Sequence, residues 1–206
     1  MLVGLAVALL IPLVATVRDY SMEARTSNLA VDSLMTIGNP LVFTVAEMGN
    51  SMSTVAYTIE LVPAVRGFDY GQSYFFASLT ALPNLFWDLH PTSTHGLLSN
   101  WLVWTVDPGR AALNGGLGFS FLAEAFLNFG WYGAPFALLA VGLLLGLLVR
   151  WAGNAQRAGS FAAVACILLF VLFFARGESA SMVRGILWYS LLPYAAVRLL
   201  VRAQGR

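Results

Sequence analysis

The chain has no lysine, a single cysteine and few charged residues of any kind. Among its 206 residues 10% are charged and 59% are hydrophobic, whereas soluble domains carry roughly 25% charged residues. One cysteine, Cys166, excludes an internal disulfide. No P-loop, GxSxG, HExxH or Cys/His zinc spacing occurs, and a net charge of +1 gives no reason to expect a nucleic-acid partner. This composition predicts an integral membrane protein.

Long apolar runs replace the missing charges. The stretch 131–149 holds 19 residues without a charge, about the length that spans a hydrocarbon core. We expect a single membrane domain, 1–206, of the all-α class. It would be a polytopic helical bundle of about four transmembrane helices, with a long outer-face segment of amphipathic helices and loops. The transmembrane helices are expected at 1–17, 117–149, 160–176 and 185–200, with a kink in the last at Pro193.

The segment 18–116 has no comparable apolar run. Residues 39–62 place apolar side chains mostly on one helical face, with Glu47 and Thr54 on the other. Aromatic residues mixed with polar ones follow, a composition that suits the headgroup level of a membrane. Residues 88–118 hold two histidines, two prolines and five glycines. This last stretch predicts a flexible loop over a functional site.

The distribution of charge predicts the topology. The 150–157 turn and the 198–206 tail hold five arginines and no acidic residue, whereas 18–116 holds four arginines and eight acidic residues. The positive-inside rule places the first two in the cytoplasm. The long segment and the 176–184 hairpin would then share the outer face, with both chain ends inside. Because the outer face has no ATP, nucleotide-driven chemistry is not expected there.

A polar stripe leads into the longest apolar run. Ser120, Glu124 and Asn128 are spaced i, i+4 and i+8, so on a helix they share one face. Lipid cannot satisfy such a stripe, so it must face protein or water. The outer face also offers arginines, which fit phosphate oxygens, and aromatic residues, which suit sugar faces. The combination indicates a lipid-linked diphosphate sugar.

Three patches resemble a known family: AEMGNSMSTVAYTIELVP at 46–63, FDYGQSYFFASLTALPNLFW at 68–87, and GLGFSFLAEAFLNFGWYGAPF at 116–136. Together they resemble the Wzy-type O-antigen polymerases, also called oligosaccharide repeat unit polymerases. The third patch is the most specific, with Gly118-Phe119-Ser120, Ala123-Glu124 and Asn128-Phe129-Gly130. The resemblance covers roughly residues 40–200. Members usually have ten or more spans, so we expect a fragment similar to the C-terminal half of such a polymerase.

The resemblance implies a metal-independent glycosyltransferase of the cytoplasmic membrane that needs no cofactor. A growing O-antigen or exopolysaccharide glycan on undecaprenyl diphosphate would be transferred to the sugar of a new lipid-linked repeat unit. The lipid bilayer and a chain-length regulator protein would be its other partners. Three alternatives stay open: an O-antigen ligase that transfers glycan to lipid A core, a transporter or flippase fragment, and a non-catalytic membrane scaffold. Apolar runs from 131 and 161 argue against transport.

Site roles are assigned on this basis. The two catalytic candidates are Glu124, which would orient or deprotonate the acceptor hydroxyl, and His95, a second candidate base. The substrate-binding candidates are Arg66, Arg176 and Arg184 on the diphosphate, Ser120 and Asn128 on sugar, and also Glu47 and Tyr70. Each has a simpler structural interpretation. An acidic group can pair with an arginine of the same surface, arginines can anchor helix ends by snorkelling, and a loop histidine can be merely solvated.

Overall fold

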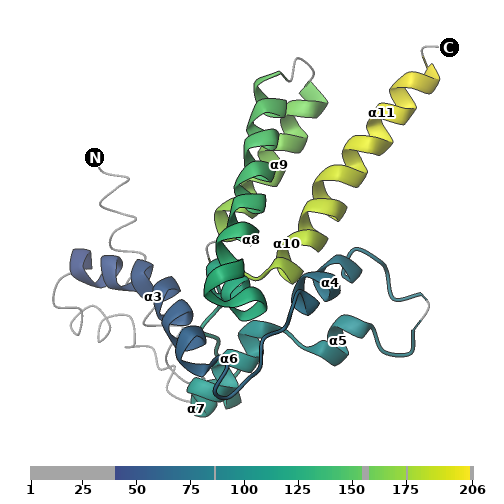
Figure 1. The fold of residues 1–206 in the computed structure, drawn as a ribbon. Helices are drawn as coiled ribbons and strands as arrows, with labels where there is room; N and C mark the ends of the chain where they lie inside the picture. The colour runs from purple at the N-terminus through teal and green to yellow at the C-terminus, as the bar shows by residue number, and fades with distance from the viewer. Residues whose placement is uncertain (1–39, 86, 155–157, 175, 205–206) are drawn as a thin grey trace, which may run out of the picture.

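The computed structural model describes residues 40–85, 87–154, 158–174 and 176–204, and every regular element in these ranges is helical (Figure 1). The expected all-α class is therefore confirmed for these ranges, whereas the helix expected at 1–17 lies outside them. In chain order the elements are α3 Pro40–Leu61, α4 Gln72–Leu79, α5 Pro91–His95, α6 Leu98–Val106, α7 Pro108–Ala112, α8 Phe121–Gly153, α9 Ala158–Phe174, α10 Ser179–Ile186, the π-helix η2 Leu187–Leu191 and α11 Leu192–Gln204.

The short helices gather at one end of the molecule, and α8, α9 and α11 extend away from them (Figure 1). Within the described residues, two helical stretches are long and apolar enough to cross a membrane, Phe121–Trp151 and Ser179–Ala203. Only 6% of the most apolar window of each is buried. The core helix of a soluble protein would be mostly buried, so this exposure fits a lipid environment. Gly159–Val171 is a shorter apolar helix, and the expected bundle of four spans stays a prediction.

Helix α3 was predicted almost to the residue, but its buried face was not. Thr54 and Thr58 are 1% and 0% exposed, whereas Met52 is 63% exposed. Thr58 Oγ1 donates to the Thr54 carbonyl at 2.7 Å, which satisfies the buried hydroxyl within the helix. Thr58 lies one turn and Thr54 two turns before Val62, which joins the core, and α3 packs against α8. Thr54 therefore lies on a different face from Met52, as predicted, but it is this polar face that packs against the protein.

The flexible loop expected at 88–118 was also wrong, because this segment folds into α5, α6 and α7. Pro91 and Pro108, which suggested breaks, stand in the first turns of α5 and α7, where a missing N–H costs nothing. Asp107 caps α7 by accepting from the backbone N–H of Arg110 at 2.9 Å. The buried residues of this region form one core with the end of α3 and the start of α8; its fully buried members are Val62, Leu98, Leu102, Phe119, Ala123, Phe126 and Leu127.

Helix α8 is broken at Gly130, whose backbone has φ 62° and ψ −163°. The break frees the carbonyls of Leu127 and Asn128, which a continuous helix would bond to residues 131 and 132. The N–H groups of Asp69 and Tyr70 donate to these carbonyls instead, at 3.0 and 3.1 Å. A glycine break in the longest helix thus holds the loop that precedes α4.

Replacing Gly130 with alanine should destabilise the protein by about 2 kcal/mol or more, because this backbone conformation is essentially restricted to glycine. An added Cβ would also lie 3.2 Å from the Phe68 ring. Gly142, further along α8, has no neighbour within 4 Å of such a Cβ, so Gly142→Ala should leave stability unchanged or raise it by up to about 1 kcal/mol. Thermal unfolding of both purified variants in the same detergent measures the difference, and equal midpoints would contradict the prediction.

The last helical stretch is irregular where Pro193 was expected to bend it. The π-helix η2 ends just before this proline, which cannot donate to the carbonyl of Tyr189 four residues earlier. The Cys166 thiol of α9 donates to that carbonyl at 3.4 Å. Gly185 in α10 lies against the Phe170 ring, where any Cβ would overlap it. Close packing of α9 against α10 therefore depends on this glycine.

Candidate functional site

The predicted polar stripe is a buried stripe at the start of α8. Ser120, Glu124 and Asn128 are 2%, 1% and 0% exposed, so they share one face as expected. The Glu124 carboxylate accepts hydrogen bonds from Ser73 Oγ at 2.8 Å and from the Ser179 backbone N–H at 2.7 Å. The Ser179 hydroxyl donates to the same carboxylate. One carboxylate therefore joins α4, α8 and α10.

Asn128 extends this network by one helical turn. Its Nδ2 donates to Ser73 Oγ at 2.7 Å and to the Glu124 carbonyl at 2.8 Å. Its Oδ1 accepts from the backbone N–H of Gly71 at 2.8 Å. Ser120 Oγ accepts from the Leu122 N–H at 3.3 Å, as a cap of α8. These hydrogen bonds join α8 to α4 and to the residue before it, and the proposed contacts of Ser120 and Asn128 with sugar stay predictions.

Tyr74 was not anticipated as part of this site. It lies on α4 next to Ser73 in the chain, half-buried and within the electrostatic field of Glu124. Burial, with the Glu124 charge adding to it, raises the pKa of the Tyr74 phenol far above its ordinary value. Like an ordinary tyrosine it is protonated at neutral pH, and burial together with the Glu124 charge makes that proton harder to remove. The sequence showed that this region is rich in aromatic residues, but it gave no reason to single out Tyr74 among them.

A second cluster surrounds Arg66. Its guanidinium binds the Asp69 carboxylate through both oxygens, with Nη2 2.8 Å from Oδ2 and 3.0 Å from Oδ1, and lies 4.8 Å from the centroid of the Trp101 ring. His95 Nε2 lies 3.9 Å from Asp69 Oδ2, and its ring stacks on Phe76 at 4.4 Å. The structure thus brings together two predicted site residues, Arg66 and His95, around an acid that sequence reasoning did not single out.

The other two predicted arginines flank a hairpin, with Arg176 in the turn before α10 and Arg184 in the last turn of α10. Arg176 and Arg184 are both exposed, and between them Ser179 binds Glu124. Gly118 makes room for this hairpin, because a Cβ there would lie 3.4 Å from the Arg176 carbonyl. The hairpin and the start of α8 are therefore in direct contact.

Glu178 is a buried acid in the same hairpin that the sequence did not reveal as important. Its carboxylate accepts from the Leu98 N–H at 2.7 Å, from the Ser99 N–H at 3.3 Å and from Ser99 Oγ at 2.8 Å. A carboxylate at the first backbone N–H groups of α6 satisfies donors that the helix leaves unbonded and offsets its dipole. Glu178 is 80 residues away from Leu98 in the chain, so no local sequence pattern predicted this cap.

The two remaining predicted residues are Tyr70 and Glu47. Tyr70 is 79% exposed and has a left-handed backbone with φ 48°. Glu47 lies within α3, and its contacts are outside what the structure describes. In the described ranges no three histidine, cysteine or acidic side chains lie close enough to hold a metal ion, and the absence of a metal from the reaction stays a prediction.

The apolar helices are exposed and extend from a layer of short helices, and buried carboxylates lie where the two parts meet. These features define an all-helical membrane protein. The chain matches the model of the family O-antigen polysaccharide polymerase Wzy over residues 1–204, and it belongs to that family. This confirms the resemblance, and the match reaches further toward the N-terminus than residue 40. No curated protein and no solved structure matches the chain significantly.

Proposed function

We propose that the chain polymerises oligosaccharide repeat units carried on undecaprenyl diphosphate, at the outer face of the cytoplasmic membrane. Membership of the O-antigen polymerase family supports the reaction class. The acidic 18–116 segment and the arginine-rich 150–157 and 198–206 stretches support the orientation. In this proposal the reaction uses neither metal nor nucleotide, since departure of the lipid diphosphate supplies the free energy.

The observation that carries the proposal is the position of the three arginines around one helical turn of α8. The 66–71 loop bonds to Leu127 and Asn128, and the α10 hairpin bonds to Glu124. Arg66, Arg176 and Arg184 therefore stand on the two segments that a single turn of α8 holds. Guanidinium groups placed so can stabilise the negative charge that develops on a departing diphosphate.

The remaining groups have roles that fit this transfer. The bond between the sugar carbon and the diphosphate oxygen breaks, a bond to the acceptor hydroxyl oxygen forms, and the hydroxyl proton passes to a base. His95 beside Asp69 is one candidate base. Glu124 is the other, although its contacts favour a role in positioning α4 and α10 around the substrate. Exposed Tyr70 would lie against sugar.

Expression of the chain in a bacterium that lacks its own polymerase and its O-antigen ligase tests the reaction. We expect polymer with a ladder of chain lengths, attached to the prenyl lipid, because polymerisation precedes transfer to lipid A core. Lipid extraction followed by gel electrophoresis of the glycans measures it, with the empty vector as the control. Single repeat units alone would contradict the proposal. Glycan transfer to lipid A core, in a strain that supplies ready-made polymer, would favour the ligase instead.

The chain-length regulator is proposed as a partner from the family resemblance alone. Its co-expression in the same strain should narrow the ladder without changing the linkage of the polymer. An unchanged distribution of lengths would contradict this part of the proposal and leave the polymerase reaction itself untouched.

A further inference from the structure

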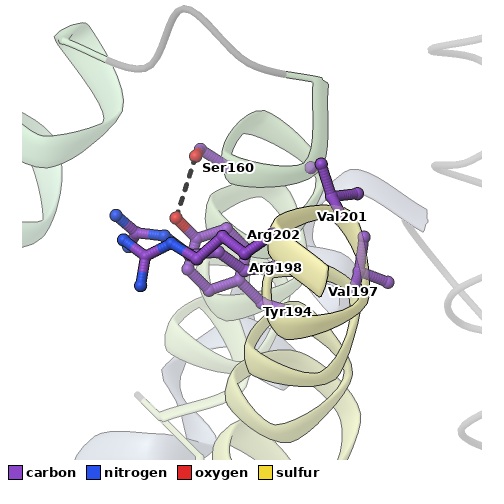
Figure 2. Close-up of a pocket in the computed structure, with 7 residues that line it drawn as sticks. Ser160, Tyr194, Val197, Arg198, Val201 and Arg202 are labelled. Atoms are coloured by element: carbon purple, nitrogen blue, oxygen red, sulfur yellow. Dashed lines mark hydrogen bonds between the residues drawn. The ribbon is translucent and has the colours of Figure 1, made fainter. Parts of the chain in front are cut away.

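A pocket lies between α9 and α11, at the end of these helices that is remote from α4 to α7 (Figures 1 and 2). Its volume of about 170 Å³ is well above the share of one water molecule, about 30 Å³. The hydroxyls of Ser160 and Tyr194 are 3.1 Å apart and join the two helices. The lining residues are Gly159, Ser160, Tyr194, Val197, Arg198, Val201 and Arg202.

Two arginines dominate the charge of this pocket. Arg198 and Arg202 are four residues apart on α11, and Figure 2 shows both side chains running to the same side, beside the Ser160–Tyr194 pair. Like charges at this spacing repel each other. The sequence has no acidic residue between 125 and 177 and none after 178, so α9, α11 and the turn before α9 contain no carboxylate to neutralise them. The arginine side of the pocket therefore favours an anion, and a guanidinium pair suits phosphate oxygens.

The surroundings of the pocket indicate that this anion belongs to a lipid. Val197 and Val201 line it and are 54% and 62% exposed, and the neighbouring Leu199 and Leu200 are 65% and 64% exposed. Figure 2 shows both valines pointing to a different side of α11 from the guanidinium groups, and all four side chains line the same pocket. Arginines near the end of an apolar helix reach the headgroup level of a bilayer while their stems stay in the apolar region.

We propose that the α9–α11 pocket binds the phosphate of an anionic phospholipid between Arg198 and Arg202, with an acyl chain along Val197 and Val201. Lipid headgroups of this kind are attracted to basic pockets between membrane helices. The site is separate from the proposed glycan site, since Arg66, Arg176 and Arg184 belong to segments at the other end of the bundle (Figure 1). It would fix α11 against α9 whether or not the chain polymerises glycan.

Trp151 provides a fluorescent reporter, because its ring lies 5.6 Å from the ring of Tyr194. The full chain would be reconstituted in phosphatidylcholine vesicles containing either brominated phosphatidylglycerol or brominated phosphatidylcholine, which quench nearby tryptophans. The difference between the wild type and Trp151→Phe isolates the signal of this one ring. We expect phosphatidylglycerol to be preferred about five- to thirtyfold, the range that one or two arginines supply at a membrane surface.

The double variant R198Q/R202Q should lower this preference to about one, whereas R198K/R202K should keep most of it because the charge remains. Arg150→Gln is the matched control, since Arg150 precedes the reporter on α8 but does not line the pocket. A wild type without preference would overturn the proposal. So would an equal loss in Arg150→Gln, which would mean general attraction to a positive surface. Displacement of the brominated lipid by millimolar inorganic phosphate would identify a small soluble anion as the ligand and overturn it too.

Discussion

Replacing Glu124 with alanine should abolish polymer formation and lower the free energy of unfolding by about 3 kcal/mol or more. Two hydroxyls and one backbone N–H, from Ser73 and Ser179, would lose their acceptor inside a buried joint. The loss should spread beyond the carboxylate, since α4 and α10 meet α8 through it. Thermal unfolding of the purified protein and the ladder of glycan lengths from the complemented strain measure the two effects.

Glu124→Gln separates positioning from direct chemistry. An amide keeps one oxygen for the hydroxyls but presents an NH₂ group to the Ser179 N–H, so we expect a loss of about 1–2 kcal/mol together with loss of polymer. Ser179→Ala should then reproduce part of the polymer defect. Glu60→Gln, on the exposed surface of α3, is the matched control and should change neither readout. A Gln variant that unfolds like the wild type yet makes no polymer would assign Glu124 to the chemistry instead.

The stripe itself was predictable because helical periodicity is a local property of the sequence. The spacing of Ser120, Glu124 and Asn128 predicts one face, and apolar residues follow it at once, so that face had to meet protein. Its partners were not predictable. Ser73 and Ser179 lie more than 50 residues from Glu124 in the chain, and serine is common in turns and helix ends, so neither position stood out.

The errors at 88–118 and in α3 have the same origin, because residue types were interpreted without regard to their position within a helix. A proline inside a helix breaks it, but one in the first turn starts it, and Pro91 and Pro108 are of the second kind. A threonine counts as polar, yet Thr58 satisfies its hydroxyl within its own helix and packs as a small side chain. Only the three-dimensional neighbours distinguish these cases.

The acids show the limit of reasoning from charge. Asp69 was counted only toward the net charge of its segment and Glu178 was assigned no role, but both are mostly buried and each holds a specific partner. Asp69 binds Arg66 through both oxygens, and Glu178 caps α6 from the α10 hairpin. Of the predicted arginines, Arg66 binds a mostly buried acid, whereas Arg176, in the turn before α10, and Arg184, in α10, have exposed side chains.

This difference predicts the second large effect. The double variant R176Q/R184Q should reduce polymer yield by about a hundredfold or more, the loss that follows when a donor to developing negative charge is removed. Stability should change little, because both residues are exposed. R176K/R184K should recover part of the yield, since lysine keeps the charge but not the forked geometry that fits a diphosphate.

Arg66→Gln supplies the contrast within the same site. It should lower both yield and stability, because Asp69 would remain mostly buried without its cation and the His95 side chain would lose its neighbouring ion pair. Arg150→Gln, at the opposite end of α8, should leave the ladder of glycan lengths unchanged. A normal ladder from R176Q/R184Q would show that the hairpin arginines only anchor a helix end, and the diphosphate would then have to be held by Arg66 or by groups outside the described residues.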